Sequence, residues 1–172
     1  MKNNYCFLQL FFLVLTLFSD QLFALEYKGR VVRVISGDTV IVFSDNRQIK
    51  VRLTDVIAPK PTQPFFDRSK NSLEALVFNK DVTVVQDKET KDKIYAKIYI
   101  GEPQLDIRCV MAPCYEQNHI GIEQLRRGMV WVDRRYTDNT ELIELEEDAK
   151  KDKLGLWQDA RPTPPWKWQA KK

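Results

Sequence analysis

The sequence is poor in the residues that build metal and nucleophile sites. Its 172 residues include one histidine, His119, and three cysteines, with no Cys-x-x-Cys pair. One histidine without an evident Ser or Cys partner does not support nucleophilic catalysis of the Ser-His or Cys-His kind. Zinc normally needs four well-spaced ligands, so a zinc protein is disfavoured as well. We interpret His119 as an ordinary polar residue near the start of a helix.

No apolar run reaches the roughly 20 residues that a membrane-spanning helix needs. The longest, FLQLFFLVLTLF at 7–18, follows Lys2 and is followed shortly by Ala24. A positive start, a short apolar stretch and a small residue are typical of a secretory signal peptide. We predict a signal peptide at 1–24, cleaved after Ala24, and an exported protein, periplasmic or secreted, with no stable membrane association after cleavage. An uncleaved membrane anchor is the alternative.

Export would place Cys109 and Cys114 in an oxidising compartment, where cysteines normally pair. We predict a disulfide between them, which would close the segment DIRCVMAPCYEQ into a small loop. The alternative is a metal site that combines these cysteines with Glu116 and His119. Cys6 would leave with the signal peptide.

The remaining chain, 25–172, is long enough for one domain with a substantial core. Residues 1–24 contain one Lys and one Asp, so the net charge without them is that of the whole chain, +3. A mildly basic protein permits a polyanionic partner without requiring one. We expect a folded domain at 25–160, a Pro/Trp-rich tail at 161–172 packed on it, and a monomer.

The hydrophobic pattern shows neither βαβ alternation nor an internal repeat. Alternation and β-branched residues predict strands at 27–36, 39–44, 47–54, 81–86 and 93–100. Helical spacing predicts helices at 67–80, 118–128 and 138–157, with Asp67 as the first N-cap and Asp138 or Asn139 as the last. Antiparallel strands with a helix between the third and fourth favour an α+β, mainly β fold. We expect a five-stranded barrel of the oligonucleotide/oligosaccharide-binding (OB) type with three helices.

Five stretches together resemble the thermonuclease family, the staphylococcal nuclease-like proteins. They are VVRVISGDTVIV, VRLTDVIAP, TQPFFDRSKNSLEALV, LRRGMVWVDRRY and LGLWQDARPTPPWKW. They occur in order over nearly all of 27–168, whereas the cysteine loop looks like an insertion. The resemblance implies Ca²⁺-dependent endonuclease chemistry on DNA and RNA. Such chemistry needs a carboxylate base, a divalent ion, stabilising cations and a basic groove.

The resemblance also implies which residues form the site. Asp38, in Gly-Asp-Thr, matches the family's first calcium ligand, and Arg52 matches its first catalytic arginine. Ala58 can still offer the backbone carbonyl that the family uses as a ligand.

Three further positions are changed. Ile57 stands where the family has its second calcium-binding aspartate, and Lys60 stands where it has the general base. Lys93 is the nearest match to the second catalytic arginine, with Ala96 as the alternative register; neither is an arginine.

These replacements invert the charge expected at the site, because Asp38 alone faces Arg52, Lys60 and Lys93. Calcium prefers about 6–8 oxygen ligands, so we expect no bound cofactor. Loss of the base alone removes roughly 10²–10⁴ in rate. We therefore expect hydrolysis to be weak or lost. A metal-free anion site would remain, able to bind single-stranded DNA, RNA or another polyanion. The alternative, to which we give equal weight, is that the three cations are only solvated surface charges.

Two other functions stay open. An active endonuclease would use a site rebuilt from Asp38, Asp55 and Arg52, because a continuous strand would direct Asp55 and Ile57 to the same side. Asp55 would then be displaced by about 6–7 Å along the strand. A periplasmic protein-interaction module would use the cysteine loop as its binding device.

Arginine pairs and tryptophans offer further contacts to a nucleic acid. The pair Arg134-Arg135 is a candidate for following a backbone, whereas for Arg126-Arg127 we prefer a charged helix face. We interpret the tryptophans as structural: Trp131, Trp157, Trp166 and Trp168.

Overall fold

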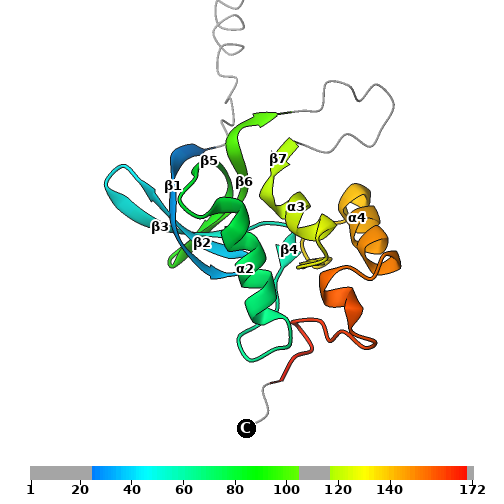
Figure 1. The fold of residues 1–172 in the computed structure, drawn as a ribbon. Coiled ribbons are helices and arrows are strands. Elements are labelled where there is room, and N and C mark those ends of the chain that lie inside the picture. The colour runs from blue at the N-terminus through cyan, green and yellow to red at the C-terminus, as the bar shows by residue number, and fades with distance from the viewer. Residues whose placement is uncertain (1–24, 105–116, 170–172) are drawn as a thin grey trace, which may run out of the picture.

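Five strands curve into a closed barrel in the computed structural model, which describes residues 25–104 and 117–169 (Figure 1). They are β1 (Glu26–Ser36), β2 (Thr39–Ser44), β3 (Arg47–Leu53), β5 (Asp81–Thr90) and β6 (Lys93–Gln104). Neighbours pair in the order β3-β2-β1-β5-β6, and β3 pairs again with β6, which closes the sheet on itself. The expected OB-type barrel is confirmed.

The pair of strands that closes the barrel is parallel, which corrects the expectation of antiparallel strands throughout. Val51 lies opposite Ile94, and Leu53 lies opposite Ala96. After β3, helix α2 (Phe66–Val77) and β5 carry the chain to the other edge of the sheet. Because β5 and β6 form a hairpin, β6 then runs in the direction of β3.

The β5–β6 hairpin is longer than the sequence pattern indicated. Thr90 pairs with Lys93, so β5 continues past the expected end at 86 to a turn at Lys91 and Asp92, and β6 begins at the expected residue. The Thr90 hydroxyl donates to the Lys93 carbonyl oxygen at 2.9 Å. Lys93 therefore begins β6 at the end of the hairpin, whereas Ala96 is fully buried in the barrel.

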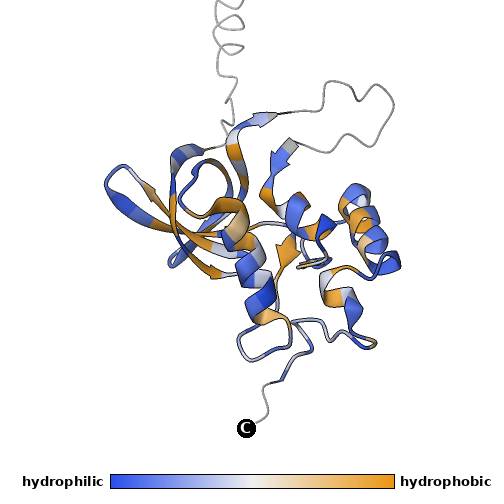
Figure 2. Ribbon diagram, in the orientation of Figure 1, coloured by the Kyte–Doolittle hydropathy of each residue, from blue (hydrophilic) through white to orange (hydrophobic). Residues whose placement is uncertain are grey.

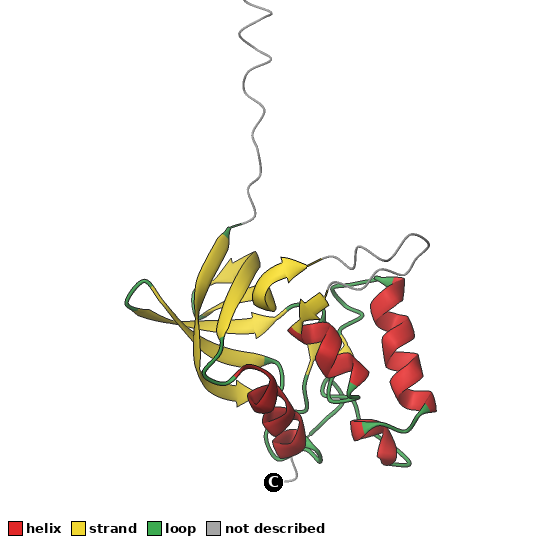
Figure 3. Ribbon diagram, turned by 45° about the horizontal axis from the view of Figure 1, so that its top comes forward, coloured by secondary structure: helices red, strands yellow, loops and turns green. Residues whose placement is uncertain are grey.

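Three α-helices of the described chain lie beside the barrel: α2, α3 (Ile120–Arg126) and α4 (Thr140–Lys151). Figure 3 shows the strands gathered in one part of the molecule and the helices in another. Leu73 and Val77 of α2 are completely buried in the main core, and apolar residues line the barrel strands near this helix (Figure 2). Within the described ranges, no helix combines the length and apolar character needed to cross a membrane.

The helix ends differ from the expected ones in two places. Helix α2 begins at Phe66, and its N-cap is Phe65 instead of Asp67. Asp67 lies in the first turn, where its negative charge interacts favourably with the helix dipole. At the start of α3, Gln117–His119 form strand β7 instead of helix. The Nδ1 atom of His119 accepts a hydrogen bond from the Ile122 amide at 3.0 Å. The interpretation of His119 as a polar residue at a helix start is thus confirmed.

A second, two-stranded sheet was not expected from the sequence. Strand β4 (Val56–Ile57) pairs antiparallel with β8 (Trp131–Val132), and Ile57 lies opposite Trp131. Both side chains are buried in a small apolar cluster with Leu156 of the 3₁₀ turn η1 (Gly155–Gln158). The Trp131 and Trp157 rings meet edge to face at 5.5 Å, which agrees with a structural role for these two tryptophans. Trp166, in contrast, is 42% exposed.

A buried carboxylate on α4 holds β8 in place. Glu146 is 3% exposed and accepts a hydrogen bond from the Val132 amide at 2.9 Å. Its other oxygen lies 2.9 Å from both the Arg134 guanidinium and the Lys150 ammonium. One charge therefore joins a helix, a strand and the segment that follows the strand.

We expect Glu146→Gln to lower the free energy of unfolding by about 1–3 kcal/mol, because an amide cannot satisfy the Val132 amide and both cations at once. Urea denaturation followed by circular dichroism measures the change. The matched control is Glu147→Gln on the same helix, whose side chain is 57% exposed and whose loss should change stability by less than about 0.5 kcal/mol. Equal effects of the two substitutions would contradict this role of Glu146.

Candidate functional site

Asp38 occupies the turn between β1 and β2 and is 6% exposed. The hydroxyls of Ser36 and Thr39 donate to its Oδ1 at 2.6 and 2.9 Å. The Ala58 amide donates to Oδ2 at 3.1 Å, and the Arg52 guanidinium lies 3.1 Å from the same oxygen. Both carboxylate oxygens are thus engaged by groups of this chain.

The pairing of β2 with β3 explains why Asp38 meets Arg52. Thr39 lies opposite Arg52 in this hairpin, so the residue before Thr39 is brought next to the arginine. The Leu53 amide also donates to the Asp38 carbonyl oxygen at 2.8 Å. The barrel therefore holds together the two residues that were expected to belong to the site.

Tyr95 brings a second cation close to Arg52. The β3–β6 pairing places Arg52 opposite Tyr95. The Arg52 guanidinium carbon lies 5.9 Å from the centre of the Tyr95 ring, and the Lys93 ammonium lies 5.2 Å from it. Arg52 and Lys93 are thus gathered around one aromatic ring, at distances typical of cation–π contacts.

Lys60 and Ile57 are placed differently. Ile57 is 7% exposed and belongs to the apolar cluster with Trp131. The Lys60 side chain is exposed, and in the described part of the chain its ammonium makes no ion pair. Lys60 also does not line the cavity beside Arg52.

A glutamine that the sequence pattern did not single out clamps the Lys60 loop to the C-terminal tail. Gln63 is 5% exposed. Its Oε1 accepts a hydrogen bond from the Lys60 amide at 2.9 Å, and its Nε2 donates to the Thr163 carbonyl oxygen at 2.5 Å. The two partners are separated by about a hundred residues, which no local pattern signals.

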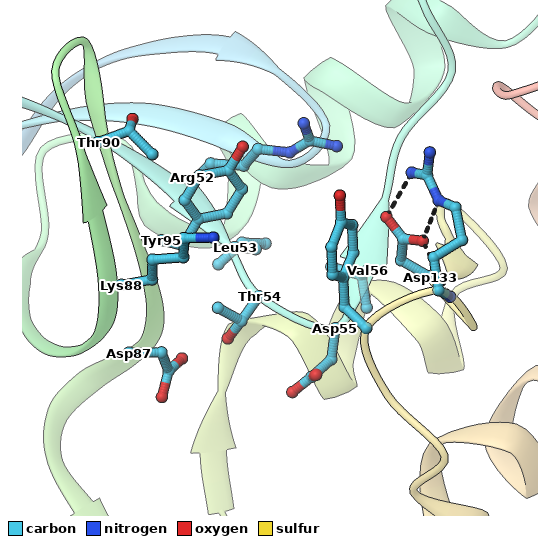
Figure 4. A pocket seen from close by; sticks show the side chains of 12 residues that line it. Arg52, Leu53, Thr54, Asp55, Val56, Asp87, Lys88, Thr90, Tyr95 and Asp133 are labelled. Carbon is cyan, nitrogen blue, oxygen red and sulfur yellow. Dashed lines mark hydrogen bonds and ion pairs between the residues drawn. The ribbon is translucent and has the colours of Figure 1, made fainter.

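A cavity of about 470 Å³ opens beside Arg52 (Figure 4). Figure 4 shows Arg52 and Tyr95 on one side and Asp133 on the other. Polar and charged side chains dominate its lining: Arg52, Thr54, Asp55, Asp87, Lys88, Thr90, Tyr95, Asp133, Arg135 and Tyr136. The cavity therefore has both cationic and anionic walls.

The Asp55 side chain lines this cavity, whereas a continuous strand would have directed it to the same side as Ile57. The positive φ angle of 62° at Asp55 interrupts the extended backbone between β3 and β4. Asp55 thus lines the cavity, whereas Ile57 packs in the apolar cluster. Burial raises the pKa of the Asp55 carboxyl, and the charges of Asp87 and Asp133 act in the same direction against the lowering effect of Lys97.

Asp133 and Arg135 form a second ion pair at the cavity wall that was not anticipated. Two guanidinium nitrogens of Arg135 donate to the two Asp133 oxygens, each at 2.7 Å. Burial acts to raise the pKa of Asp133, but the hydrogen bonds and charge of Arg135 outweigh it and hold this pKa below its usual range. An acid two residues before an arginine was the available signal in the sequence.

The other arginines considered for backbone contact are also paired. Arg134 bonds Glu146, and Arg127 lies 2.9 Å from Glu123 one helical turn away. Arg126 lies 3.9 Å from the same glutamate. The charged helix face preferred for Arg126 and Arg127 agrees with these contacts.

Cys109, Cys114 and residues 1–24 lie outside the described residues, so the disulfide and the signal peptide stay predictions.

Comparison with known proteins places these residues in a wider context. The family model described as "Staphylococcal nuclease homologue" matches residues 50–159, which include Arg52, Lys60 and Lys93. A protein named "Uncharacterized endonuclease" from Escherichia coli is 33% identical over 160 residues, covering 93% of this chain and 96% of that protein.

Two further relatives are similar. "Protein ParB" of Escherichia coli is 32% identical over 146 residues, covering 84% of this chain and 80% of its own length. "Micrococcal nuclease" of Shigella flexneri is 31% identical over 153 residues, covering 84% of this chain and 81% of its own length. The similarity thus extends over most of both chains in each comparison.

We expect Asp55→Asn to stabilise the protein near neutral pH. A raised pKa means that the folded state binds the proton more tightly than the unfolded state, so stability falls as pH rises through that pKa. The amide carries no charge, and asparagine tolerates the left-handed backbone. The gain over the parent protein should shrink as pH falls and vanish below the ordinary carboxyl pKa of 3.8.

Urea denaturation at a series of pH values measures this difference. Asp45→Asn is the matched control, because Asp45 also has a positive φ, of 47°, but lies exposed in the β2–β3 turn. A stability difference between Asp55→Asn and the parent protein that does not change with pH would show that burial does not raise the pKa of this carboxyl.

Proposed function

Because the chain belongs to the staphylococcal nuclease homologue family, we propose that it binds single-stranded nucleic acid while hydrolysing it weakly or not at all. Family membership supports a nuclease-like function. The proposal adds that binding is retained at Arg52 and Lys93 and that calcium-dependent cleavage is reduced or lost. It also places this activity in an exported monomer, as expected from the sequence.

The full engagement of Asp38 is the observation that carries the proposal. Calcium takes about 6–8 oxygen ligands and gains most from carboxylates. Here the one matching carboxylate already accepts bonds from two hydroxyls and an amide and pairs with Arg52. Within the described residues, no group of three or more His, Cys, Asp or Glu is placed to share a metal. The residues present do not fit a calcium ion.

The position of the general base supports reduced hydrolysis as well. A charged lysine has three donors and no acceptor, so it does not take a proton from an attacking water. Lys60 stands at this position, with its amide bonded to Gln63. Absence of a base costs roughly 10²–10⁴ in rate, before any effect of the metal.

Binding is better supported than cleavage. A guanidinium offers a planar fork to phosphate oxygens, and an ammonium offers a point charge. Arg52 and Lys93 provide one of each around Tyr95, and Tyr136, 76% exposed, stands at the cavity wall. Aromatic rings beside cations stack on bases while the cations hold phosphates. These four residues suit a single strand with splayed bases.

A second candidate, an active endonuclease with a rebuilt site, is favoured by one observation. Asp55 shares the cavity with Arg52, and burial raises its pKa, which is a property of many catalytic bases. Asp38, the other acid of that site, does not line the cavity. We therefore rank this candidate second. The interaction module depends on the cysteine loop, which lies outside the described residues.

We expect no calcium binding at micromolar concentration when the purified protein is titrated calorimetrically. The reason is that Ca²⁺ would have to displace the Arg52 guanidinium and the Ala58 amide from a buried carboxylate. Micromolar binding that disappears in Asp38→Asn would overturn this account of the site. Asp45→Asn, in an exposed turn, is the control.

We expect fluorescence anisotropy to detect binding of a labelled single-stranded oligonucleotide equally in calcium and in a chelator. Arg52→Gln should weaken it by about 10–100-fold, because a hydrogen bond to a charged group is worth about 1.5–3 kcal/mol. Arg30→Gln is the control, since Arg30 pairs with exposed Asp81 outside the cavity. Circular dichroism checks that each variant is folded.

The same oligonucleotide should remain intact on denaturing gels. Cleavage in calcium that the chelator stops, and that Asp38→Asn abolishes, would reject the proposal. Cleavage lost in Asp55→Asn but kept in Asp45→Asn would favour the second candidate.

A further inference from the structure

A second hollow lies at the end of the β5–β6 hairpin. It has a volume of about 240 Å³ and lies between the first residues of β3 and the hairpin turn. Four cations line it: Arg47, Lys50, Lys91 and Lys93. Two carboxylates, Glu89 and Asp92, share the lining. We call this hollow the hairpin groove; its lining carries an excess of positive charge.

The cations of the hairpin groove are not neutralised by close partners. In the part of the chain that the structure describes, Arg47, Lys50 and Lys91 make no ion pair within 4.0 Å. Elsewhere on the barrel, Lys28 lies 2.6 Å from Glu102 and Arg30 lies 2.9 Å from Asp81. The positive potential of the groove is thus available to a ligand.

The hairpin groove adjoins the cavity beside Arg52 at one shared residue. Thr90 lines both hollows. Lys93 lines the groove, while its ammonium lies over the ring of Tyr95, which lines the cavity. A chain of phosphates could therefore pass from Arg52 to Lys93 and on around the hairpin end.

The groove also has an apolar and aromatic part. Ile49 and Ile94 line it together with Tyr27. The Tyr27 hydroxyl donates to Gln86 at 2.8 Å, which fixes the ring between β1 and β5. Proteins that bind single strands combine a basic groove with aromatic stacking surfaces in this way.

We propose that the hairpin groove binds the backbone phosphates of the nucleotides next to the one at Arg52, so that the ligand is an extended single strand rather than an isolated nucleotide. The inference rests on the proposed function and names its binding path. Each neutralised phosphate releases counterions, so the path should be visible in the salt dependence of binding.

The test compares two oligothymidylates, a dinucleotide and a strand of about twelve nucleotides, at several salt concentrations. The variant Arg47→Gln/Lys50→Gln/Lys91→Gln removes three groove charges. The control Arg33→Gln/Lys80→Gln/Lys151→Gln removes the same residue types from exposed positions that do not line the groove. Thermal unfolding checks the fold, and the single variants Lys50→Gln and Lys91→Gln replace the triple variant if it is not folded.

We expect the longer strand to bind the parent protein more tightly and with a steeper salt dependence than the dinucleotide. The groove variant should bind the dinucleotide unchanged and lose the advantage of the longer strand. Its slope of log K against log salt should fall by roughly two units, at about 0.7 per phosphate contact. The control variant should keep the slope of the parent.

The other outcomes separate the two proposals. If the parent protein binds neither oligonucleotide, the proposed function itself fails. If it binds both but the groove and control variants have the same slope, the hairpin groove is not the path, while the proposed function stands. Competition by polyglutamate of equal charge, at equal strength, would show an acidic peptide surface instead and overturn the inference.

Discussion

The buried ion pair between Asp38 and Arg52 constrains the whole site. It joins the β1–β2 turn to β3, and the Ala58 amide adds the segment that follows β4. A buried carboxylate without partners is strongly destabilising, so these bonds are needed for the fold as well as for the site. The same bonds occupy the oxygens that a metal would use. Stability of the barrel and the proposed exclusion of calcium would therefore follow from one arrangement.

Charge is divided across the cavity rather than uniformly positive. Arg52 and Lys93 stand together at Tyr95, and the hairpin groove extends the positive region beyond them. Asp55 and Asp133 lie on the wall away from Arg52 (Figure 4), and the pKa of Asp55 is raised by burial and, to a smaller extent, by the charges of Asp87 and Asp133. A phosphate backbone would avoid that wall and follow the hairpin side. In the proposed binding mode, repulsion by these acids would therefore favour a strand that follows the hairpin groove.

Much of the barrel could be predicted from the sequence, because its strands carry the regular signal of alternating and β-branched residues. The proximity of Asp38 and Arg52 followed from the family resemblance and is realised by the pairing of Thr39 with Arg52. The last residues of β5, 87–90, were not predicted as strand, because an exposed, charged strand has no apolar alternation. The parallel closure by β3 and β6 depends on chain path, which periodicity does not encode.

Contacts between distant segments were beyond prediction for a related reason. Gln63 and Thr163 meet through a backbone carbonyl, and a backbone group leaves no mark in the residue pattern. The two-residue strands β4 and β8 are too short to show a period. The ion pair of Asp133 with Arg135 is part of a cavity wall only because the strand is interrupted at Asp55 and β8 lies beside it. Neither feature has a signal in the sequence.

The two positions at which the resemblance predicts a change from the family, 57 and 60, are not equivalent physically. Lys60 is exposed, so a carboxylate there would remain in water and cost little. Ile57 is packed against Trp131 and Leu156, and an aspartate there would place a charge in an apolar cluster at a cost of several kcal/mol. The cluster also receives β8, which Glu146 holds through the Val132 amide. A second metal ligand at position 57 would therefore require repacking of β4, β8 and η1, so the proposed loss of metal binding would be a property of the packing and not of one side chain.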